Sequence, residues 1–214
     1  MTTSIIKCPI CGEGPVIDET CPAACGSLEG ILPCDVDRTK KAPTFGYDWA
    51  NGYVAPFVGV DQQTAKDALM AANVSENDEV VDLGCGDGRV CIEACQLGAN
   101  AKGFDLDTDL ITKAKAQAAE KLIATRYERR PKFDVKDLFE VDLNQFTVIC
   151  MFLLPETLDR LAPSLLIEMT KGRRIISFGW QVPGLGEPRA YCRGKADSTA
   201  TERWYLYTKT ESAK

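Results

Sequence analysis

Hydrophobic and polar positions follow two patterns along most of the chain, one with helical periodicity and one typical of strands. Behind Asp61, a residue type that caps helices, small apolar residues recur at helical spacing. Short apolar runs typical of buried strands then alternate with longer amphipathic segments. This alternation predicts a doubly wound α/β sheet. We expect strands at 79–83, 101–105, 147–152, 174–178, 189–193 and 203–207, another starting at Phe133, and helices at 61–73, 89–97, 108–125 and 155–169.

Residues 1–44 follow neither of these patterns. They are rich in Cys, Pro and Gly, which is typical of a module built from loops. We therefore expect two parts, a small Cys-rich module at 1–44 and a main domain at 45–214. The scattered cysteines of the main domain lie in apolar stretches and are interpreted as small core residues: Cys85, Cys91, Cys95, Cys150 and Cys192.

Composition narrows the possible functions. The chain has 214 residues, 45% of them hydrophobic, which suits one domain with a small appendage. A net charge of −6 argues against nonspecific binding to a nucleic-acid backbone and favours a basic partner such as a lysine-bearing protein. The absence of histidine excludes His-dependent triads, bases and metal ligands. Without an apolar run of membrane-spanning length or a signal sequence, we expect a cytoplasmic protein and no membrane insertion.

The most informative motif is VVDLGCGDGRV at residues 80–90, where a strand runs into a glycine-rich turn and a helix. Its GxGxG spacing differs from the GxGxxG of dinucleotide folds. Asp82 would repel a pyrophosphate there but could accept from a cationic amino-acid tail. Asp105, at the end of the next strand, is placed to accept both hydroxyls of a ribose. A nucleoside with an amino-acid tail is S-adenosylmethionine, which we predict as the cofactor.

Further cofactor contacts are expected along the same strand ends. The glycines allow a flat ligand edge to lie against the backbone, and Asp137 could accept from an adenine amino group while Leu138 offers its backbone N–H. The alternatives are that the glycines only make a tight turn and that Asp137 is a solvated turn acid. The predicted cofactor residues are Asp82, Gly84, Cys85, Gly86, Asp105, Leu106, Asp137 and Leu138.

The segment at 146–156 is where a methyl group would project. It lacks both the Asn-Pro-Pro-aromatic run of amino-directed nucleic-acid methyltransferases and a Pro-Cys nucleophile. An apolar, aromatic mouth with Phe152 and Trp180 as candidate walls remains. Such a mouth suits a lysine, because its apolar stem can thread a channel while desolvation lowers the amine pKa from about 10.4. The alternative is that this segment is only core.

Residues from about 53 to 207 resemble the compact seven-strand protein lysine methyltransferases, which include a broad-specificity archaeal enzyme and the ATP synthase c-subunit lysine methyltransferase. The resemblance rests on Phe57-Val58 ahead of the first helix, DLGCGDGRV, GFDLD at 103–107, FEVD at 139–142, the segment at 147–154 with its MFLL end, and RIISF at 174–178. It implies a Rossmann-like, seven-stranded class I methyltransferase sheet.

Site roles also follow from the resemblance, position by position. It implies that Asp82, Gly84 and Gly86 bind the methionine part of the cofactor, that Asp105 binds ribose and that Asp137 binds adenine. It places Met151 with Phe152 at the reaction mouth. With Trp180, these two complete the candidate catalytic set.

The N-terminal cysteines form a separate pattern. Cys8-Pro-Ile-Cys11-Gly and Cys21-Pro-Ala-Ala-Cys25-Gly resemble two zinc knuckles, and four thiolates would complete a closed structural zinc site. Cys34 is an alternate ligand. Such a site would brace the domain or recruit a substrate. The other interpretation is a reduced, loosely ordered leader without metal.

The sequence thus predicts an S-adenosylmethionine-dependent methyltransferase acting on a protein lysine. Two alternatives stay open. One is a ribosomal RNA base methyltransferase with an N-terminal zinc module, which the acidic balance and the missing Asn-Pro-Pro-aromatic run disfavour. The other is a noncatalytic binding module that retains the cofactor fold, which the intact Asp82 and Asp105 disfavour.

Overall fold

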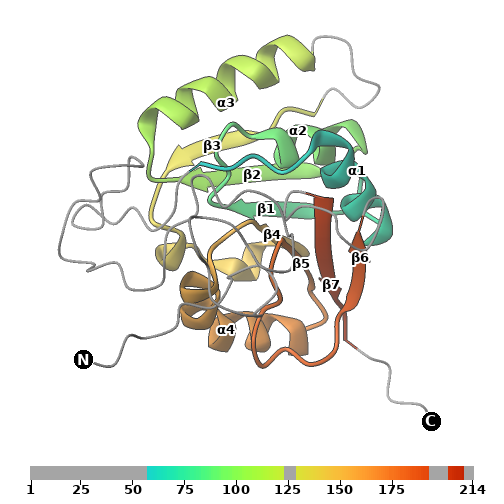
Figure 1. Cartoon of the computed structure of the whole chain (residues 1–214). Helices are drawn as coiled ribbons and strands as arrows, with labels where there is room; N and C mark the ends of the chain where they lie inside the picture. Colours follow the sequence, from blue (N-terminus) through green and yellow to red (C-terminus); the bar gives the residue numbers. More distant parts are fainter. Residues whose placement is uncertain (1–56, 123–128, 193–201, 210–214) are drawn as a thin grey trace, which may run out of the picture.

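The computed structural model describes residues 57–122, 129–192 and 202–209. Within them, a seven-stranded sheet carries helices on both faces, as Figure 1 shows. The predicted module at 1–44, with Cys8, Cys11, Cys21 and Cys25, lies outside the described residues, as does the boundary at residue 45. The α/β sheet itself is confirmed.

The strand order is β3-β2-β1-β4-β5-β7-β6. The first five strands in this order are parallel, while β7 runs antiparallel to both β5 and β6. The order reverses between β1 and β4, and ligands of open α/β sheets bind in the crevice outside the strand ends at such a point. The strands are β1 (Glu79–Leu83), β2 (Asn100–Asp105), β3 (Lys132–Val135), β4 (Val148–Met151), β5 (Arg174–Phe178), β6 (Arg189–Cys192) and β7 (Arg203–Tyr207).

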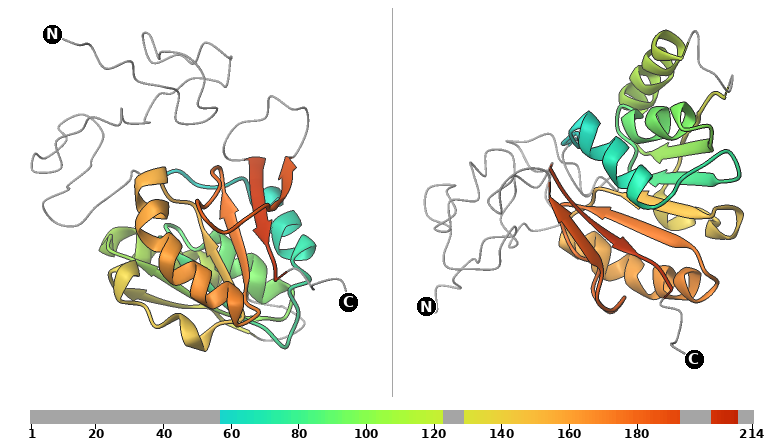
Figure 2. Two further views of the ribbon diagram at one scale, coloured as in Figure 1. Left: turned by 90° about the horizontal axis from the view of Figure 1, so that it is seen from below. Right: turned by 90° about the vertical axis from the view of Figure 1, so that its right-hand side faces the viewer.

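Three helices cover one face of the sheet and one long helix covers the other, an arrangement visible in Figures 1 and 2. The first face carries α1 (Gln62–Ala71), α2 (Arg89–Gln96) and α3 (Thr108–Lys121). The second carries α4 (Pro155–Thr170) and the short 3-10 turns η2 (Leu138–Glu140) and η3 (Leu143–Gln145). Each face buries its own hydrophobic cluster, so the sheet is covered on both sides as a parallel sheet requires.

Local chemistry explains where the helices begin. The Asp61 carboxylate accepts the backbone N–H of Thr64 at 3.0 Å and caps α1, as the sequence predicts. The Asp107 carboxylate caps α3 in the same way. Pro155 is the first residue of α4, where its missing N–H has no consequence. None of the helices in the described ranges is long and apolar enough to cross a membrane.

The core cysteines also behave as expected. Cys85, Cys91, Cys95 and Cys150 are free and buried, and burial raises the pKa of the Cys95 thiol to about 12. Thiols in such surroundings stay protonated and act as small apolar side chains. For these four positions the core interpretation is confirmed.

Candidate active site

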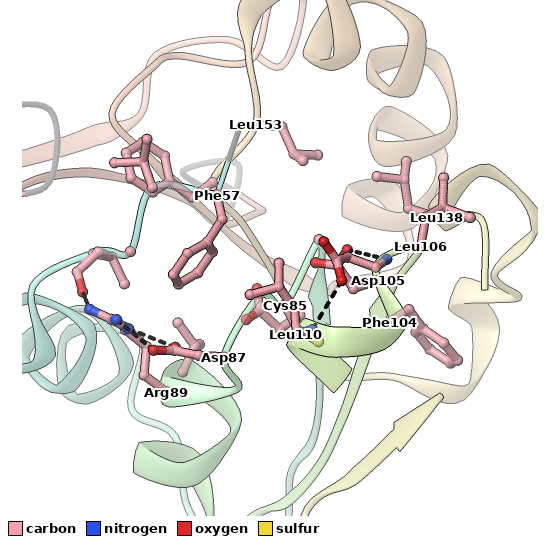
Figure 3. Close-up of a pocket in the computed structure, with 18 of the residues that line it drawn as sticks. Phe57, Cys85, Asp87, Arg89, Phe104, Asp105, Leu106, Leu110, Leu138 and Leu153 are labelled. Atoms are coloured by element: carbon pink, nitrogen blue, oxygen red, sulfur yellow. Dashed lines mark hydrogen bonds and ion pairs between the residues drawn. The ribbon is translucent and has the colours of Figure 1, made fainter. Parts of the chain in front are cut away.

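A cavity opens where β1, β2 and β4 end, at the reversal of the strand order (Figure 3). Its walls come from segments far apart in the sequence: residues 57–60, the turn after β1, the end of β2, residues 136–139 after β3, and the end of β4. The sheet topology brings them together because parallel strands all end at the same edge. The strand ends singled out from the sequence therefore meet at one site.

The glycine-rich turn forms the floor of this cavity. The backbone N–H groups of Gly84 and Cys85 both donate to the carbonyl of Phe104 at 2.9 Å, which ties the turn to β2. Gly84, Gly86 and Gly88 have φ values of 76°, 51° and 80°. L-residues rarely adopt this left-handed region, so the motif needs glycine at these positions.

Asp82 is a buried acid without a partner. Its side chain is 4% exposed, lines the cavity, and accepts no hydrogen bond from any residue in the described ranges. Burial raises the pKa of Asp82 well above its usual range, and the nearby carboxylates of Asp105 and Asp87 raise it further. A buried carboxylate with acidic neighbours is poised to receive a cation.

Asp105 lies across the turn and supports it. One carboxylate oxygen accepts the N–H of Gly86 at 2.8 Å and the other accepts the N–H of Asp107 at 3.0 Å. Burial raises the pKa of Asp105, although these backbone donors counteract the rise. Each carboxylate oxygen has a further acceptor position, so Asp105 can still receive hydroxyl donors. Its role in holding the turn was not predicted.

An apolar wall stands beyond Asp105, formed by Leu106, Leu138, Phe104 and Phe139. Asp137 also lines the cavity, and its carboxylate accepts the N–H of Phe139 at 2.9 Å, so that it caps η2. This local bond uses one of the two oxygens that the sequence assigned to adenine. The adenine role of Asp137 and Leu138 stays a prediction.

The three residues predicted to form the reaction mouth lie in different surroundings. Phe152 lines the cavity, and the Trp180 ring packs against it with centroids 5.5 Å apart. Met151 has no exposed surface and lies in the core on the α4 side of the sheet, outside the cavity lining. Leu153, which the sequence did not single out, lines the cavity instead. Strand alternation separates Met151 from Phe152, because neighbouring side chains point to opposite faces. Leu153 reaches the cavity from just beyond the end of β4.

Sequence reasoning also missed the contact between the glycine motif and the segment before α1. Arg89 forms a bidentate ion pair with Asp87 and donates to the carbonyl of Val60 at 2.7 Å. Phe57 lies over Gly86, and a Cβ at that glycine would be 2.2 Å from the Phe57 ring. Arg89 and Asp87 lie inside the quoted motif, but nothing in their spacing indicates residues about thirty positions earlier.

The arrangement fits S-adenosylmethionine. Asp82 offers a buried carboxylate that lacks a hydrogen bond within the described ranges, and the backbone of Gly84 and Cys85 lines the cavity beside it. Gly86 lies outside the lining, under the Phe57 ring. The carboxylate oxygens of Asp105 offer acceptor positions for hydroxyl groups. The apolar wall beyond Asp105, formed by Leu106, Leu138, Phe104 and Phe139, suits a nucleoside base. Within the described ranges, no group of three or more His, Cys, Asp or Glu side chains could hold a metal ion.

Solved structures share this fold. A match is the RNA methyltransferase from Salinibacter ruber in complex with S-adenosylhomocysteine, which is 28% identical with a TM-score of 0.61. The alignment covers 73% of this chain and 97% of that one. The Rossmann-like class I methyltransferase fold predicted from the sequence is thereby confirmed.

Curated relatives carry lysine-directed names. A protein-lysine N-methyltransferase of Saccharolobus islandicus (strain REY15A) is 33% identical over 60% of this chain and 79% of its own length. An ATP synthase c-subunit lysine N-methyltransferase of Rattus norvegicus is 29% identical over 49% of this chain, which spans only 46% of that protein. Residues 82–189 match the model of the ANTKMT methyltransferase domain. The resemblance stated from the sequence is confirmed, and the chain belongs to the ANTKMT methyltransferase domain family.

Proposed function

We propose that this protein transfers methyl groups from S-adenosylmethionine to lysine side chains of a protein substrate. One observation carries the proposal: a single cavity combines an unpaired buried carboxylate, Asp82, with an apolar aromatic exit at Phe152. The first feature suits the charged end of the cofactor and the second suits an amine on an apolar stem. The lysine-directed names of the relatives support the same acceptor.

Each cofactor group has a candidate partner. We assign the amino group of the methionine part to Asp82, with the backbone of Gly84, Cys85 and Gly86 beside it. The ribose hydroxyls go to Asp105. Leu106 and residues 137–139 would hold the base, with Asp137 and Leu138 as its polar contacts. When bound, the cofactor supplies a methyl group on a positively charged sulfur.

The acceptor side needs little acid–base chemistry. Trp180 packs against Phe152 and does not itself line the cavity, so we propose that the lysine stem approaches along the Phe152 side of this ring pair. Such apolar surroundings disfavour the ammonium form of lysine, so desolvation lowers the amine pKa and frees the lone pair. The two rings also orient the stem, and positioning of this kind supplies a large part of the rate in a bimolecular transfer.

An RNA acceptor is the second candidate, because the Salinibacter ruber protein that aligns over nearly its full length is named an RNA methyltransferase. The net charge of −6 opposes this candidate. A noncatalytic cofactor-binding protein is the third.

One experiment separates these candidates. The purified protein and S-adenosylmethionine with a tritiated methyl group are incubated with a cell extract, which is then divided and treated with protease or with nuclease. We expect label that protease releases, nuclease leaves in place and mass spectrometry assigns to lysine. Label that only nuclease releases would establish the RNA acceptor. Tight cofactor binding without label in either fraction would support the noncatalytic protein.

The N-terminal region is proposed to be a separate zinc module at residues 1–44, with Cys8, Cys11, Cys21 and Cys25 as ligands. The two knuckle-like spacings support it. Metal analysis of protein purified without chelator should find about one zinc per chain. The Cys8→Ser, Cys11→Ser double variant should lose the metal, and Cys34→Ser should keep it. Protein free of metal, with all these thiols reactive, would contradict the module.

A reducing compartment such as the cytoplasm is proposed as the location. The free, buried thiols of Cys85, Cys91, Cys95 and Cys150 support it, because proteins of oxidising compartments rarely keep so many cysteines unpaired. Fluorescence microscopy of the tagged full chain tests this location.

A further inference from the structure

One wall of the cavity belongs neither to the sheet nor to the helices. Residues 57–60, which we call the flap, precede α1, and all four of them line the cavity. Val60 is 4% exposed and belongs to the hydrophobic core. Phe57 and Val58, at the other end, are 42% and 44% exposed. The flap is therefore anchored at Val60 and lies against the cavity at Phe57.

Arg89 connects the flap to the floor of the cavity. Its Nη1 donates to the backbone carbonyl of Val60 at 2.7 Å, while Nε and Nη2 donate to the two carboxylate oxygens of Asp87 at 2.8 and 2.6 Å. The guanidinium also lies flat against Gly59, where a Cβ would be 2.4 Å from Cζ. Arg89 thus holds the flap at two consecutive residues, and Gly59 permits the approach.

Phe57 completes the contact at the exposed end. Its ring covers Gly86, and the Arg89 Cζ and the Lys113 Nζ lie 5.8 and 5.6 Å from its centroid. Figure 3 shows the ring pointing into the cavity, toward the turn that carries Cys85. The flap therefore covers the part of the glycine-rich turn to which we assign the methionine end of the cofactor.

We propose that Arg89 is a positioning residue that holds the flap over the cofactor site and slows the exchange of S-adenosylmethionine and its product. This inference rests on the proposed function, because the ligand that the flap would retain is the cofactor assigned to this cavity. A guanidinium is needed because its planar fork reaches Asp87 and the Val60 carbonyl together. A lysine ammonium at this position reaches only one of them at a time.

Stopped-flow measurement of S-adenosylhomocysteine dissociation tests the proposal. Arg89→Ala should release the ligand about tenfold faster or more, because charge-assisted bonds to the flap are lost. Arg89→Lys should fall between Arg89→Ala and the parent. Gly59→Ala should resemble Arg89→Ala, since its methyl group displaces the guanidinium. Lys113→Ala, which removes the other cation beside Phe57 and leaves the Val60 bond, should change the rate by less than about twofold.

A double-mutant cycle shows whether Arg89 acts through the flap. Phe57→Ala should also speed release, and the Phe57→Ala, Arg89→Ala double variant should be no faster than the quicker single variant, because both changes open the same segment. Rates that multiply would mean that Arg89 acts elsewhere and would overturn the proposal. An unchanged rate in Arg89→Ala and Gly59→Ala would overturn it as well.

Hydrogen exchange keeps the outcome separate from that of the proposed function. In the ligand-free protein, Arg89→Lys should lose amide protection at Thr64 and Ala65, whose N–H groups donate to Asp61 directly after the flap, and retain it in β1 and β4. If the parent binds no S-adenosylmethionine, the cofactor assignment fails while this measurement still reports whether Arg89 holds the flap. Unchanged protection at Thr64 and Ala65 would show that Arg89 does not hold it.

Discussion

At the scale of single residues, the cavity is organised by uncompensated negative charge. Asp82 is buried, and the carboxylates of Asp105 and Asp87 are near enough to raise its pKa further. Asp87 has Arg89 as its partner, and Asp105 has backbone donors. Asp82 alone among these three acids lacks a hydrogen bond in the described structure, so the free protein retains a destabilising feature that a cationic ligand would relieve.

The Asp82→Asn variant should bind the cofactor more weakly but be more stable than the parent in the absence of ligand. The amide keeps the size of the side chain but removes the charge, so the affinity for S-adenosylmethionine should fall about 10- to 100-fold, the usual loss for a charge-assisted bond. The ligand-free variant should melt a few degrees higher, since about 1 kcal/mol corresponds to about 2–4 °C in a chain of this size. Calorimetry gives the affinity and thermal melts give the stability. Equal affinity in variant and parent would place the ammonium elsewhere.

The same residue predicts a pH dependence of stability. The folded-state pKa of Asp82 is raised, so the unfolded chain gives up this proton at lower pH than the folded one does. The contribution of Asp82 to the free energy of unfolding therefore falls as pH rises from about 4 toward the raised pKa. Urea titrations of ligand-free parent and Asp82→Asn should show a gap that widens with pH over this window. A constant gap would mean that Asp82 is not desolvated.

Phe152→Ala tests the reaction mouth. Phe152 lines the cavity and packs against Trp180, whereas Asp82 and Asp105 lie on the cofactor side. Turnover at saturating cofactor should fall about tenfold or more, with cofactor affinity changed by less than about threefold, because only the transfer step loses its walls. Steady-state kinetics with binding by calorimetry give both numbers. Phe152→Leu serves as the control that retains apolar volume, and a matching loss of affinity would contradict the role.

At the scale of elements, the loop after β5 decides where the mouth lies. The Ser177 hydroxyl donates to the carbonyl of Trp180 at 2.7 Å, and the Tyr207 hydroxyl on β7 accepts the N–H of Val182 at 2.7 Å. Burial raises the pKa of the Tyr207 phenol to about 12, so it remains protonated at physiological pH. Both hydroxyls are buried under this loop, and they fix the backbone that carries the Trp180 ring.

Tyr207→Phe should therefore change acceptor recognition and leave the cofactor site intact. It leaves the buried N–H of Val182 without its acceptor, at a cost of about 1–3 kcal/mol, and the loop should relax. We expect a raised KM for the acceptor, a lowered kcat and an unchanged S-adenosylmethionine affinity. Tyr205→Phe, on the same strand, is the matched control. An effect confined to thermal stability would contradict a positioning role.

The elements were largely predictable because their signals are local. The strands at 79–83, 174–178 and 203–207 have the predicted bounds, since each is a short, largely apolar segment bounded by polar or glycine residues. The 3-10 turns η2 and η3 were not predicted, because their apolar residues lack a helical period. The antiparallel insertion of β7 between β5 and β6 was also missed, since pairing between strands far apart in sequence leaves no periodic signal.

At the scale of the whole molecule, the strand ends that form the site could be predicted from the sequence. The contacts between these strand ends and the rest of the site could not. The acids and glycines of the site follow from strand ends and turn chemistry, and they line one cavity. The contacts of Arg89 with Val60 and of Phe57 with Gly86 depend on how α1 packs against α2. Such tertiary contacts have no sequence period, and this is why Leu153 was missed while Met151 was chosen.

The pH dependence of turnover tests the whole assembly of cofactor site and apolar mouth. A lysine amine reacts only when neutral, and its pKa in water is about 10.4, so kcat/KM for the acceptor should rise up to about tenfold per pH unit above neutrality. kcat, which reports the bound amine, should level off at a lower pH than kcat/KM, where the desolvated amine is already neutral. Measurements at saturating cofactor from about pH 7 to about pH 10 give the profile. Asp82→Asn, assayed at cofactor concentrations that saturate it, should keep the same slope, because Asp82 serves the cofactor and not the amine. A profile that is flat over this range would mean that no lysine proton is lost before the transfer, and the acceptor would then be another group.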